Sequence, residues 1–248
     1  MEPAKEWLAL YAQKKELTKS TVDFNKYFDE KEIAGIPLDI MDIGLCDLPG
    51  GKVIVADPLV YIDKDCTPYL VQAPAGSYKT EVCVIKPYDG DCARYSVVRL
   101  RFNQNRAAKF YEALIGSEDL ENFEEGEYFG FNVDAGLGCI CDAQVNKIIT
   151  DWRENWEKQN PDGEIYNDYF YELFKESYKQ NPQYQRDGGD WINWQVPGTD
   201  YHVPFFQAGF GDGTYPVYWG FDESGAVCQL IIQFIDIERD YSDEDEEE

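Results

Sequence analysis

Aromatic and β-branched residues alternate with glycine-rich breaks near the carboxyl end of the chain, between positions 201 and 237. The runs 203–207, 214–221 and 226–237 have the composition of β-strands. The glycine-rich segment 209–213 ends the first run, and 222–225 has the glycine that a four-residue turn favours in its last position. The pattern predicts three antiparallel strands. The third is too apolar for an exposed edge and is expected inside a sheet.

Further strands are predicted upstream, at 52–57, 69–72, 78–86 and 93–102, where apolar residues lie between Pro- and Gly-containing turns. Strands that are separated by such short turns pair antiparallel.

Two short runs at 128–133 and 138–142 predict a hairpin around the turn 134–138. The segment 21–46 is interrupted by Gly35 and Pro37 and is expected to be irregular. For 106–114 the local signals conflict, because capping residues favour a helix and the aromatic pair favours a strand.

Helical spacing of apolar residues occurs in three places: near the start of the chain, at 143–159 and at 164–180. The last two form a predicted helical hairpin that covers one side of the sheet. The expected fold is α+β: a mostly antiparallel β sandwich or barrel-like sheet with an N-terminal helix and an inserted helical hairpin. A single domain is expected over 1–239, with a helical N-terminal segment 1–47 and a disordered acidic tail at 240–248.

Several segments together resemble an uncharacterised bacterial family, the one catalogued as domain of unknown function 4241. The resemblance rests on 48–59, on 74–78, on 128–136 with 139–142, and on 209–217. It implies a compact, mostly β domain of bacterial origin. It implies no activity, because the family has no established chemistry.

The net charge of −26 is too large for the acidic tail alone to explain, because the tail from Asp240 contributes seven acids and the rest still carries −19. An acidic body repels nucleic-acid phosphates and anionic lipid headgroups. We therefore expect no nucleic-acid partner and no membrane partner. A basic protein partner, bound cations and simple solubility all remain open.

The chain contains seven cysteines, no CxxC pair and no signal-peptide pattern, which favours reduced thiols and a cytoplasmic location. No apolar run approaches the length of a membrane span. Cys139 and Cys141 alternate along a predicted strand and face the same side. A structural zinc site needs about four ligands, so small core residues are the better interpretation of this pair.

Two Asp/Gly loops give the sharpest local signal for a metal site. If they lie at one end of the sheet, Asp134, Asp142, Asp212 and Asp222 offer carboxylate ligands for a divalent cation such as calcium or magnesium. Tight turns require the same residue types for backbone reasons, so a purely structural role is the competing interpretation. Paired carboxylates also suit acid/base chemistry. His202 is the only histidine, which excludes a multi-histidine metal site.

Aromatic residues near the C-terminal strands offer a surface for a partner, because Tyr and Trp are enriched at binding hot spots. The candidates are Trp191, Trp194, Tyr215, Tyr218 and Trp219. Packing within the sheet is the alternative.

Two functional hypotheses follow. The first is a non-catalytic cytoplasmic binding protein, in one form immunity-like, whose acidic surface binds a basic protein partner. The alternative is a metal-dependent hydrolase or metal-stabilised domain that uses the Asp/Gly loops and needs a divalent cation, whereas the first hypothesis needs no cofactor. The oligomeric state does not follow from the sequence.

Overall fold

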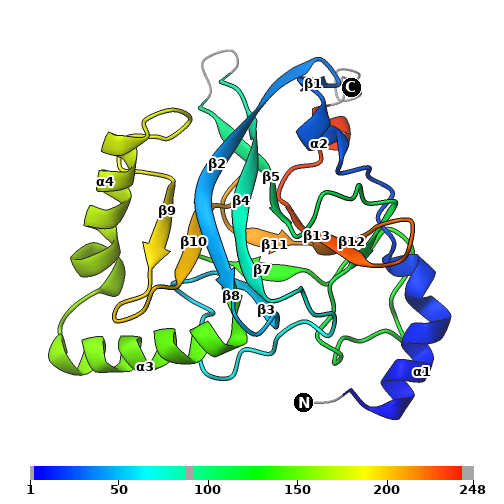
Figure 1. Ribbon diagram of the computed structural model, residues 1–248, viewed down its shortest axis with the longest axis horizontal. Helices are drawn as coiled ribbons and strands as arrows, with labels where there is room; N and C mark the ends of the chain where they lie inside the picture. Colours follow the sequence, from blue (N-terminus) through cyan, green and yellow to red (C-terminus); the bar gives the residue numbers. More distant parts are fainter. Residues whose placement is uncertain (1–2, 88–91, 242–248) are drawn as a thin grey trace, which may run out of the picture.

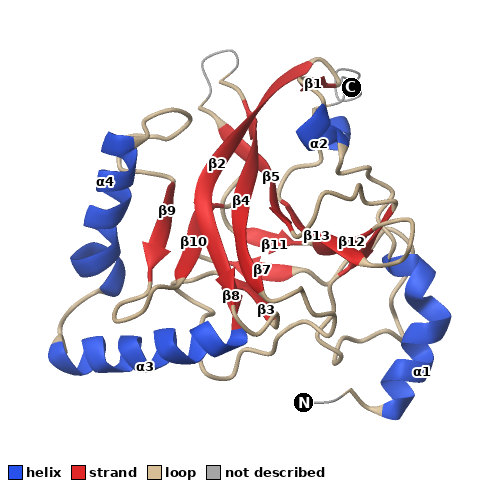
Figure 2. Cartoon of the chain, viewed as in Figure 1, coloured by secondary structure: helices blue, strands red, loops and turns tan. Residues whose placement is uncertain are grey.

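The structure, a computed structural model, describes residues 3–87 and 92–241 and is an α+β fold of mainly antiparallel sheets (Figures 1 and 2). The helical segments are α1 (Lys5–Lys14), the 3-10 turn η1 (Lys15–Thr18), α2 (Lys26–Asp29), α3 (Ala143–Gln159), the π-helical turn η2 (Tyr166–Phe170), α4 (Tyr171–Gln180) and α5 (Ile237–Asp240). The strands are β1 (Glu32–Ile33), β2 (Ile36–Leu48), β3 (Val53–Ala56), β4 (Gly76–Ile85), β5 (Arg94–Arg101), β6 (Lys109–Glu112), β7 (Phe131–Val133), β8 (Leu137–Asp142), β9 (Trp191–Gln195), β10 (His202–Gln207), β11 (Gly213–Tyr215), β12 (Val217–Phe221) and β13 (Val227–Gln233).

The larger sheet has seven strands in the order β1-β2-β4-β5-β13-β12-β6, and neighbouring strands pair antiparallel. It curls into a half-barrel. The pairing of β2 with β4 shifts register between Asp42 and Leu45, at a bulge that contains Gly44 with φ of +102°. Such bulges bend a strand and increase its twist. A Cβ atom at Gly44 would lie 2.5 Å from the Asn193 side chain, so the close approach of β9 also requires glycine here.

The smaller sheets have the order β3-β8-β10-β9 and β11-β7. Alternation along β8 connects two cores: Ile140 belongs to the cluster that faces the seven-stranded sheet, whereas Cys139 and Cys141 belong to the cluster under the helices. The four-stranded sheet is therefore the middle of three layers, between the curled sheet and the helices α3 and α4 (Figure 1). The two cysteines are fully buried, as the packing interpretation predicts.

The helical hairpin is confirmed, and the sequence explains its start. Asp142 is the N-cap of α3, with its side chain accepting a hydrogen bond from the backbone N–H of Gln144 at 2.7 Å. Val145 and Ile149 of α3 and Phe174 of α4 pack in the core under the helices. The N-terminal helix is confirmed as α1, which buries no residue completely and lies on the opposite side of the molecule (Figure 1).

Four predictions about strands are corrected. The strand expected at 69–72 does not form, because this segment lies in the connection between β3 and β4. The hairpin of 128–133 with 138–142 is wrong, because β7 pairs with β11 and β8 pairs with β3 and β10. Of the three strands expected in 201–237, only β12 and β13 form the predicted hairpin, whereas β10 joins the four-stranded sheet. The run 214–221 is split at Pro216, which has no N–H to donate to a ladder.

The segment 21–46 is not irregular, and 1–47 is not all helical, because β2 extends over thirteen residues from Ile36. Pro37 lies at the beginning of this strand, and Gly44 lies in its bulge. Both residues interrupt the sequence pattern without ending the strand. The conflict over 106–114 is resolved in favour of a strand, since β6 pairs with β12. The tail beyond residue 241 lies outside the described residues. Within those residues, no helix is both long enough and apolar enough to cross a membrane.

Candidate functional site

A cleft of about 1110 Å³ lies at the β6 end of the seven-stranded sheet. Its lining residues come from five parts of the chain that are far apart in sequence: 16–25, 106–112, 125–128, 210–218 and 233–240. The chain thus builds the cleft from the sheet edge, from the loop before β7, and from segments close to both ends of the described chain.

The N-terminal wall of the cleft is held against the edge of β6 by backbone contacts. Lys19 forms an isolated antiparallel bridge with Tyr111, and the N–H of Ser20 donates to the carbonyl oxygen of Phe110 at 3.0 Å. These bonds use backbone groups that an edge strand would otherwise leave unpaired. The segment after η1 is therefore an extension of the sheet.

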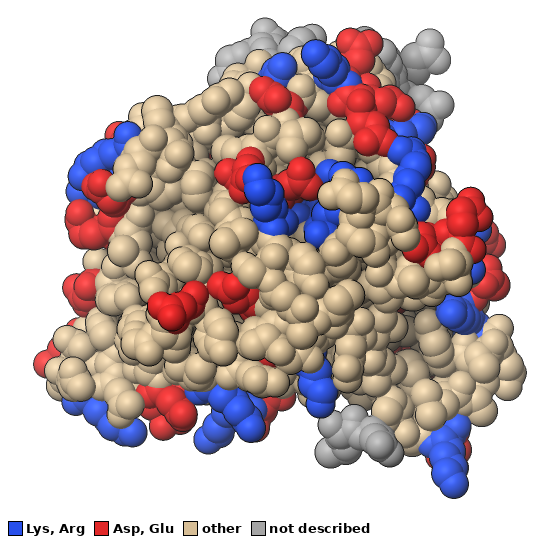
Figure 3. Space-filling model, in the orientation of Figure 1, with Lys and Arg blue, Asp and Glu red and all other residues tan. Residues whose placement is uncertain are grey.

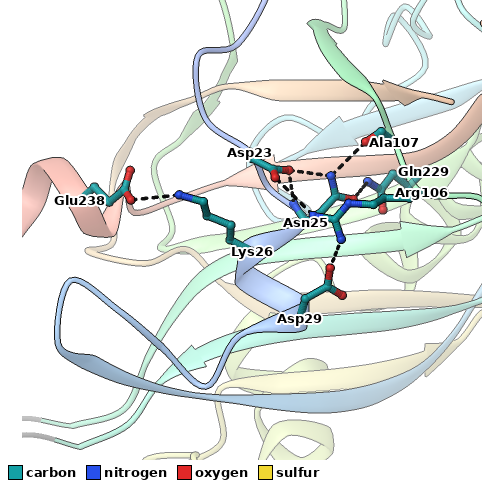
Figure 4. Close-up of polar contacts among 8 residues, drawn as sticks. All are labelled: Asp23, Asn25, Lys26, Asp29, Arg106, Ala107, Gln229 and Glu238. Carbon is teal, nitrogen blue, oxygen red and sulfur yellow. Dashed lines mark hydrogen bonds and ion pairs between the residues drawn. The ribbon is translucent and has the colours of Figure 1, made fainter. Parts of the chain in front are cut away.

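A polar network fixes the same wall next to α2 (Figure 4). The Arg106 guanidinium forms ion pairs with Asp29 and, at 3.3 Å, with Asp23. The side-chain amide of Asn25 donates to Asp23 at 2.6 Å and to the carbonyl oxygen of Ala107 at 3.0 Å. Since Arg106 and Ala107 precede β6, this network anchors the turn before α2 to the strand that lines the cleft.

The C-terminal wall is linked to the N-terminal wall by one ion pair. The Lys26 ammonium in α2 lies 3.4 Å from Glu238 in α5 (Figure 4). Both side chains are substantially exposed, so this pair contributes little to stability. The backbone N–H of Ile237 in α5 also donates a buried hydrogen bond to the Tyr27 hydroxyl in α2 at 3.1 Å, so two contacts join these helices.

Acidic groups outnumber basic groups in the cleft. The acidic lining residues are Glu16, Asp23, Glu112, Glu125, Glu127, Asp236 and Asp240, and the basic ones are Lys19, Arg106, Lys109 and Arg239. Two of these bases are paired within the chain, Arg106 with Asp23 and Asp29, and Arg239 with Asp240. On the molecular face drawn in Figure 3, by comparison, acidic and basic side chains are interspersed among broad uncharged areas.

Aromatic side chains form much of the remaining lining, namely Phe110, Tyr128, Phe210, Tyr215, Tyr218 and Phe234. Phe210 is 54% exposed, and Tyr128 is also exposed. Aromatic rings beside carboxylates provide both partners that a cationic group prefers, a negative charge and the negative face of a ring.

Glu112, the last residue of β6, is the most unusual charged group of the cleft. It is only 3% exposed, and its Oε1 atom accepts hydrogen bonds from the backbone N–H groups of Phe129 at 2.7 Å and Gly130 at 2.8 Å. Burial raises the pKa of Glu112 to about 7. The two amide donors lower the pKa and the nearby Glu118 carboxylate raises it further, so the removal of water outweighs the hydrogen bonds.

Two buried tyrosines, Tyr69 and Tyr218, lie near the carboxyl group of Glu112. Tyr218 lies directly opposite Glu112 in the β12–β6 register, and the charge of Glu112 contributes to a raised pKa at both Tyr218 and Tyr69. Burial is the larger cause in both cases, so the two phenols are neutral at ordinary pH.

Two of the predicted metal ligands lie at adjacent turns. Asp134 accepts a hydrogen bond from the Tyr61 hydroxyl, and Asp212 accepts one from the backbone N–H of Gly136 at 3.0 Å. The fully buried Asp57 carboxylate holds this turn from the other side, through the N–H groups of Asp134 at 3.1 Å and Ala135 at 2.6 Å. The sequence left open whether the two Asp/Gly loops converge, and the pairing of β7 with β11 places them side by side.

The other two predicted ligands cap separate structures. Asp142 caps α3 and also accepts from the N–H of Gly50 at 2.9 Å. Asp222 organises the β12–β13 turn, where hydrogen bonds from Ser224 and Asn105 lower its pKa. Within residues 3–87 and 92–241 no group of three or more His, Cys, Asp or Glu side chains is arranged to hold a metal ion. The four aspartates therefore do not form one site.

The aromatic residues proposed for a partner surface are buried. Trp191, Trp194 and Trp219 are 7%, 3% and 1% exposed and pack in the cores, so the expectation of an exposed groove is wrong for these three. Tyr215 and Tyr218 are also mostly buried but do line the cleft. For these two, partner binding stays a prediction.

Sequence reasoning missed the central role of Glu112 and the N-terminal wall. The available signal for Glu112 was a single acid within the apolar run 110–115. The wall gave no signal, because 16–25 is polar and lies next to β6 only after folding.

A family model described as "Protein of unknown function (DUF4241)" matches residues 46–232. No curated protein and no solved structure matches the chain.

Proposed function

The chain belongs to the DUF4241 family, and we propose that it is a non-catalytic binding protein that takes a basic segment of a protein partner into the acidic cleft. The observation that carries this proposal is the composition of the cleft: a cavity of about 1110 Å³ in which acids outnumber bases and aromatic rings fill the space between them.

The size of the cleft fits a peptide segment. Ligand pockets for small molecules are generally about 300–1,000 Å³ and mostly enclosed. This cleft, at about 1110 Å³, is larger than that range, and exposed aromatics such as Phe210 lie at its surface. Several residues of an extended chain can therefore lie in it, with their cationic side chains among the acids.

The charge of the whole chain favours the same class of partner. The net charge of −26 attracts a basic protein at long range and raises its association rate, whereas it repels nucleic acids.

The single histidine, His202, contacts Asp47 at 3.2 Å and is not among the residues that line the cleft. One concrete form of the proposal is an immunity-like role in a bacterial cytoplasm, in which the cleft covers the basic substrate site of a toxin.

Fluorescence anisotropy with labelled nona-arginine and nona-glutamate tests the proposal. We expect the basic peptide to bind, the acidic peptide not to bind, and the affinity for the basic peptide to fall as salt is raised. The double variant Glu125→Lys/Glu127→Lys reverses two exposed charges of the cleft, and we expect it to bind nona-arginine at least about tenfold more weakly.

The matched control is Glu154→Lys/Glu157→Lys on the exposed face of α3, which changes the net charge by the same amount outside the cleft lining. We expect this control to lose less than about threefold in affinity. Equal losses in the two double variants would show that only net charge matters, and they would overturn the cleft as the binding site.

A further inference from the structure

One oxygen atom of the Glu112 carboxyl group has no hydrogen-bond or ion-pair partner among the residues that the structure describes. Both amide hydrogen bonds go to Oε1, and the described residues provide neither a hydrogen bond nor an ion pair to Oε2. The residue is nevertheless 97% buried, and it lines the cleft. A buried carboxylate that lines a cavity and has only one oxygen hydrogen-bonded is an incomplete site, because buried charges are ordinarily paired.

Within residues 3–87 and 92–241, no positively charged group lies beside Glu112. From β12 it faces the Tyr218 phenol, from the segment before β4 the Tyr69 phenol, and from the loop after β6 the carboxylate of Glu118. Lys109, on the same strand, lies three positions away and so points to the opposite face, where its ammonium approaches the Tyr111 ring at 5.6 Å. The groups around the carboxylate are thus neutral or negative.

The walls near this carboxyl group are aromatic. Phe110 shares its face of β6, and Tyr218 lies directly across from it. Ring faces attract an ammonium or guanidinium group and do not hydrogen-bond to an anion. The combination selects a cation over a neutral polar group.

We infer that Glu112, with Phe110 and Tyr218, forms a subsite for the ammonium or guanidinium group of one lysine or arginine side chain of the partner. The inference rests on the proposed function and specifies which residue gives the cleft its selectivity. The cationic group donates hydrogen bonds to Oε2 and supplies the positive charge that the described residues do not place there.

A consequence of this site is that binding releases a proton. The carboxyl group of the free protein is substantially protonated near pH 7, as its raised pKa indicates. A cation in the subsite favours the carboxylate and lowers the pKa. The proton passes to the solvent as the ion pair forms, and no covalent bond other than O–H changes.

Isothermal titration calorimetry with nona-lysine and nona-arginine at pH 6.5, in buffers of different ionisation enthalpy, measures this proton. For the wild-type protein we expect release of about half a proton or more per peptide. Glu112→Gln keeps an oxygen for the two backbone amides, and we expect it to release none and to bind roughly tenfold more weakly at pH 8. Circular dichroism verifies that this variant is folded.

Glu154→Gln on α3 is the control, and it should release the same proton as the wild type. Peptides of acetyl-lysine and citrulline, which lack the positive charge, should not release it. If Glu112→Gln binds and releases protons like the wild type, the subsite is overturned while the proposed function stands. If neither cationic peptide binds the wild type, the proposed function fails and the subsite fails with it.

Discussion

Two buried carboxyl groups, Asp57 and Glu112, show how the same chemistry serves different purposes in one chain. Asp57 uses both oxygens: Oδ1 accepts from the N–H of Leu59 at 2.9 Å, and Oδ2 accepts from those of Asp134 and Ala135. Glu112 uses one oxygen only. The first carboxylate is satisfied within the fold, and the second is, under the proposed function, completed by a cationic group of the partner.

The difference shows how a buried carboxylate that stabilises the fold can be distinguished from one that is available to bind a ligand. Both groups are at least 97% buried, so burial alone does not separate them. What separates them is whether each lone pair of the carboxylate has a donor in the chain, and whether a cavity adjoins the atom that lacks one. The predictions below test this distinction, starting with the largest effect.

The structural role of Asp57 predicts the largest loss of stability. Asp57→Ala leaves three backbone N–H groups without their acceptor, and we expect the free energy of unfolding to fall by about 4 kcal/mol. Urea-induced unfolding followed by tryptophan fluorescence measures the change. The exposed Asp65, in the same loop, provides the control, and Asp65→Ala should change the free energy of unfolding by less than about 0.5 kcal/mol. A loss below about 1 kcal/mol for Asp57→Ala would contradict the comparison.

The binding role of Glu112 predicts a dependence of stability on pH. Its pKa is raised from 4.5 to about 7 in the folded protein, so between these values the folded state holds more protons than the unfolded state. The contribution of Glu112 to stability is therefore fully present below pH 4.5 and is lost as pH rises through 7.

Unfolding curves of wild type and Glu112→Gln at a series of pH values measure this contribution as a difference. We expect the wild type to lose on the order of 3 kcal/mol relative to the variant between pH 4 and pH 8. Parallel pH profiles for the two proteins would show that Glu112 titrates normally, and the comparison with Asp57 would then fail.

Asp142 extends the comparison to a third buried carboxylate, whose two oxygens accept from the N–H groups of Gln144 and Gly50. Asp142→Ala removes a helix N-cap, and we expect the free energy of unfolding to fall by about 1–2 kcal/mol. Chemical denaturation measures it. Asp142→Asn, which keeps one oxygen acceptor, should lose less than the alanine variant, and the opposite order would count against the capping role.

Arg106 gives the smallest effect, because its ion pairs with Asp23 and Asp29 are exposed. We expect Arg106→Gln to lower the free energy of unfolding by at most about 1 kcal/mol. Thermal unfolding at low and high salt measures the effect, which should shrink as salt screens the pairs. A loss above about 2 kcal/mol would show that this exposed network behaves like the buried carboxylates.

Local signals predicted the parts of the fold that short turns connect. The β12–β13 hairpin follows from the turn at Asp222, and α3 follows from its apolar stripe and its cap. The pairing of β7 with β11 joins residues about eighty positions apart, and no local pattern encodes it. The predicted hairpin around 134–138 is wrong for this reason. The turn was recognised correctly, but the strand before it pairs with β11 and the strand after it pairs with β3 and β10.

The candidate site was less predictable than the fold. Sequence reasoning selected Asp and Gly at turns, where backbone geometry requires them, and large aromatics, most of which fill the cores. Glu112 differs from the other 47 acidic residues only through its environment. That environment depends on Tyr69, Phe129 and Tyr218, which come from separate parts of the sheet and its loops.

The two walls of the cleft, 16–25 and 233–240, lie outside the residues 46–232 that the family model matches. Glu112 of β6, which also lines the cleft, lies inside the matched residues. Under the proposed function, sequence changes in the end segments alter which protein is recognised, while the part that the family shares supplies the proposed cation-binding carboxylate. Exchanging these end segments between family members is accordingly a direct route to engineering new recognition on an unchanged scaffold.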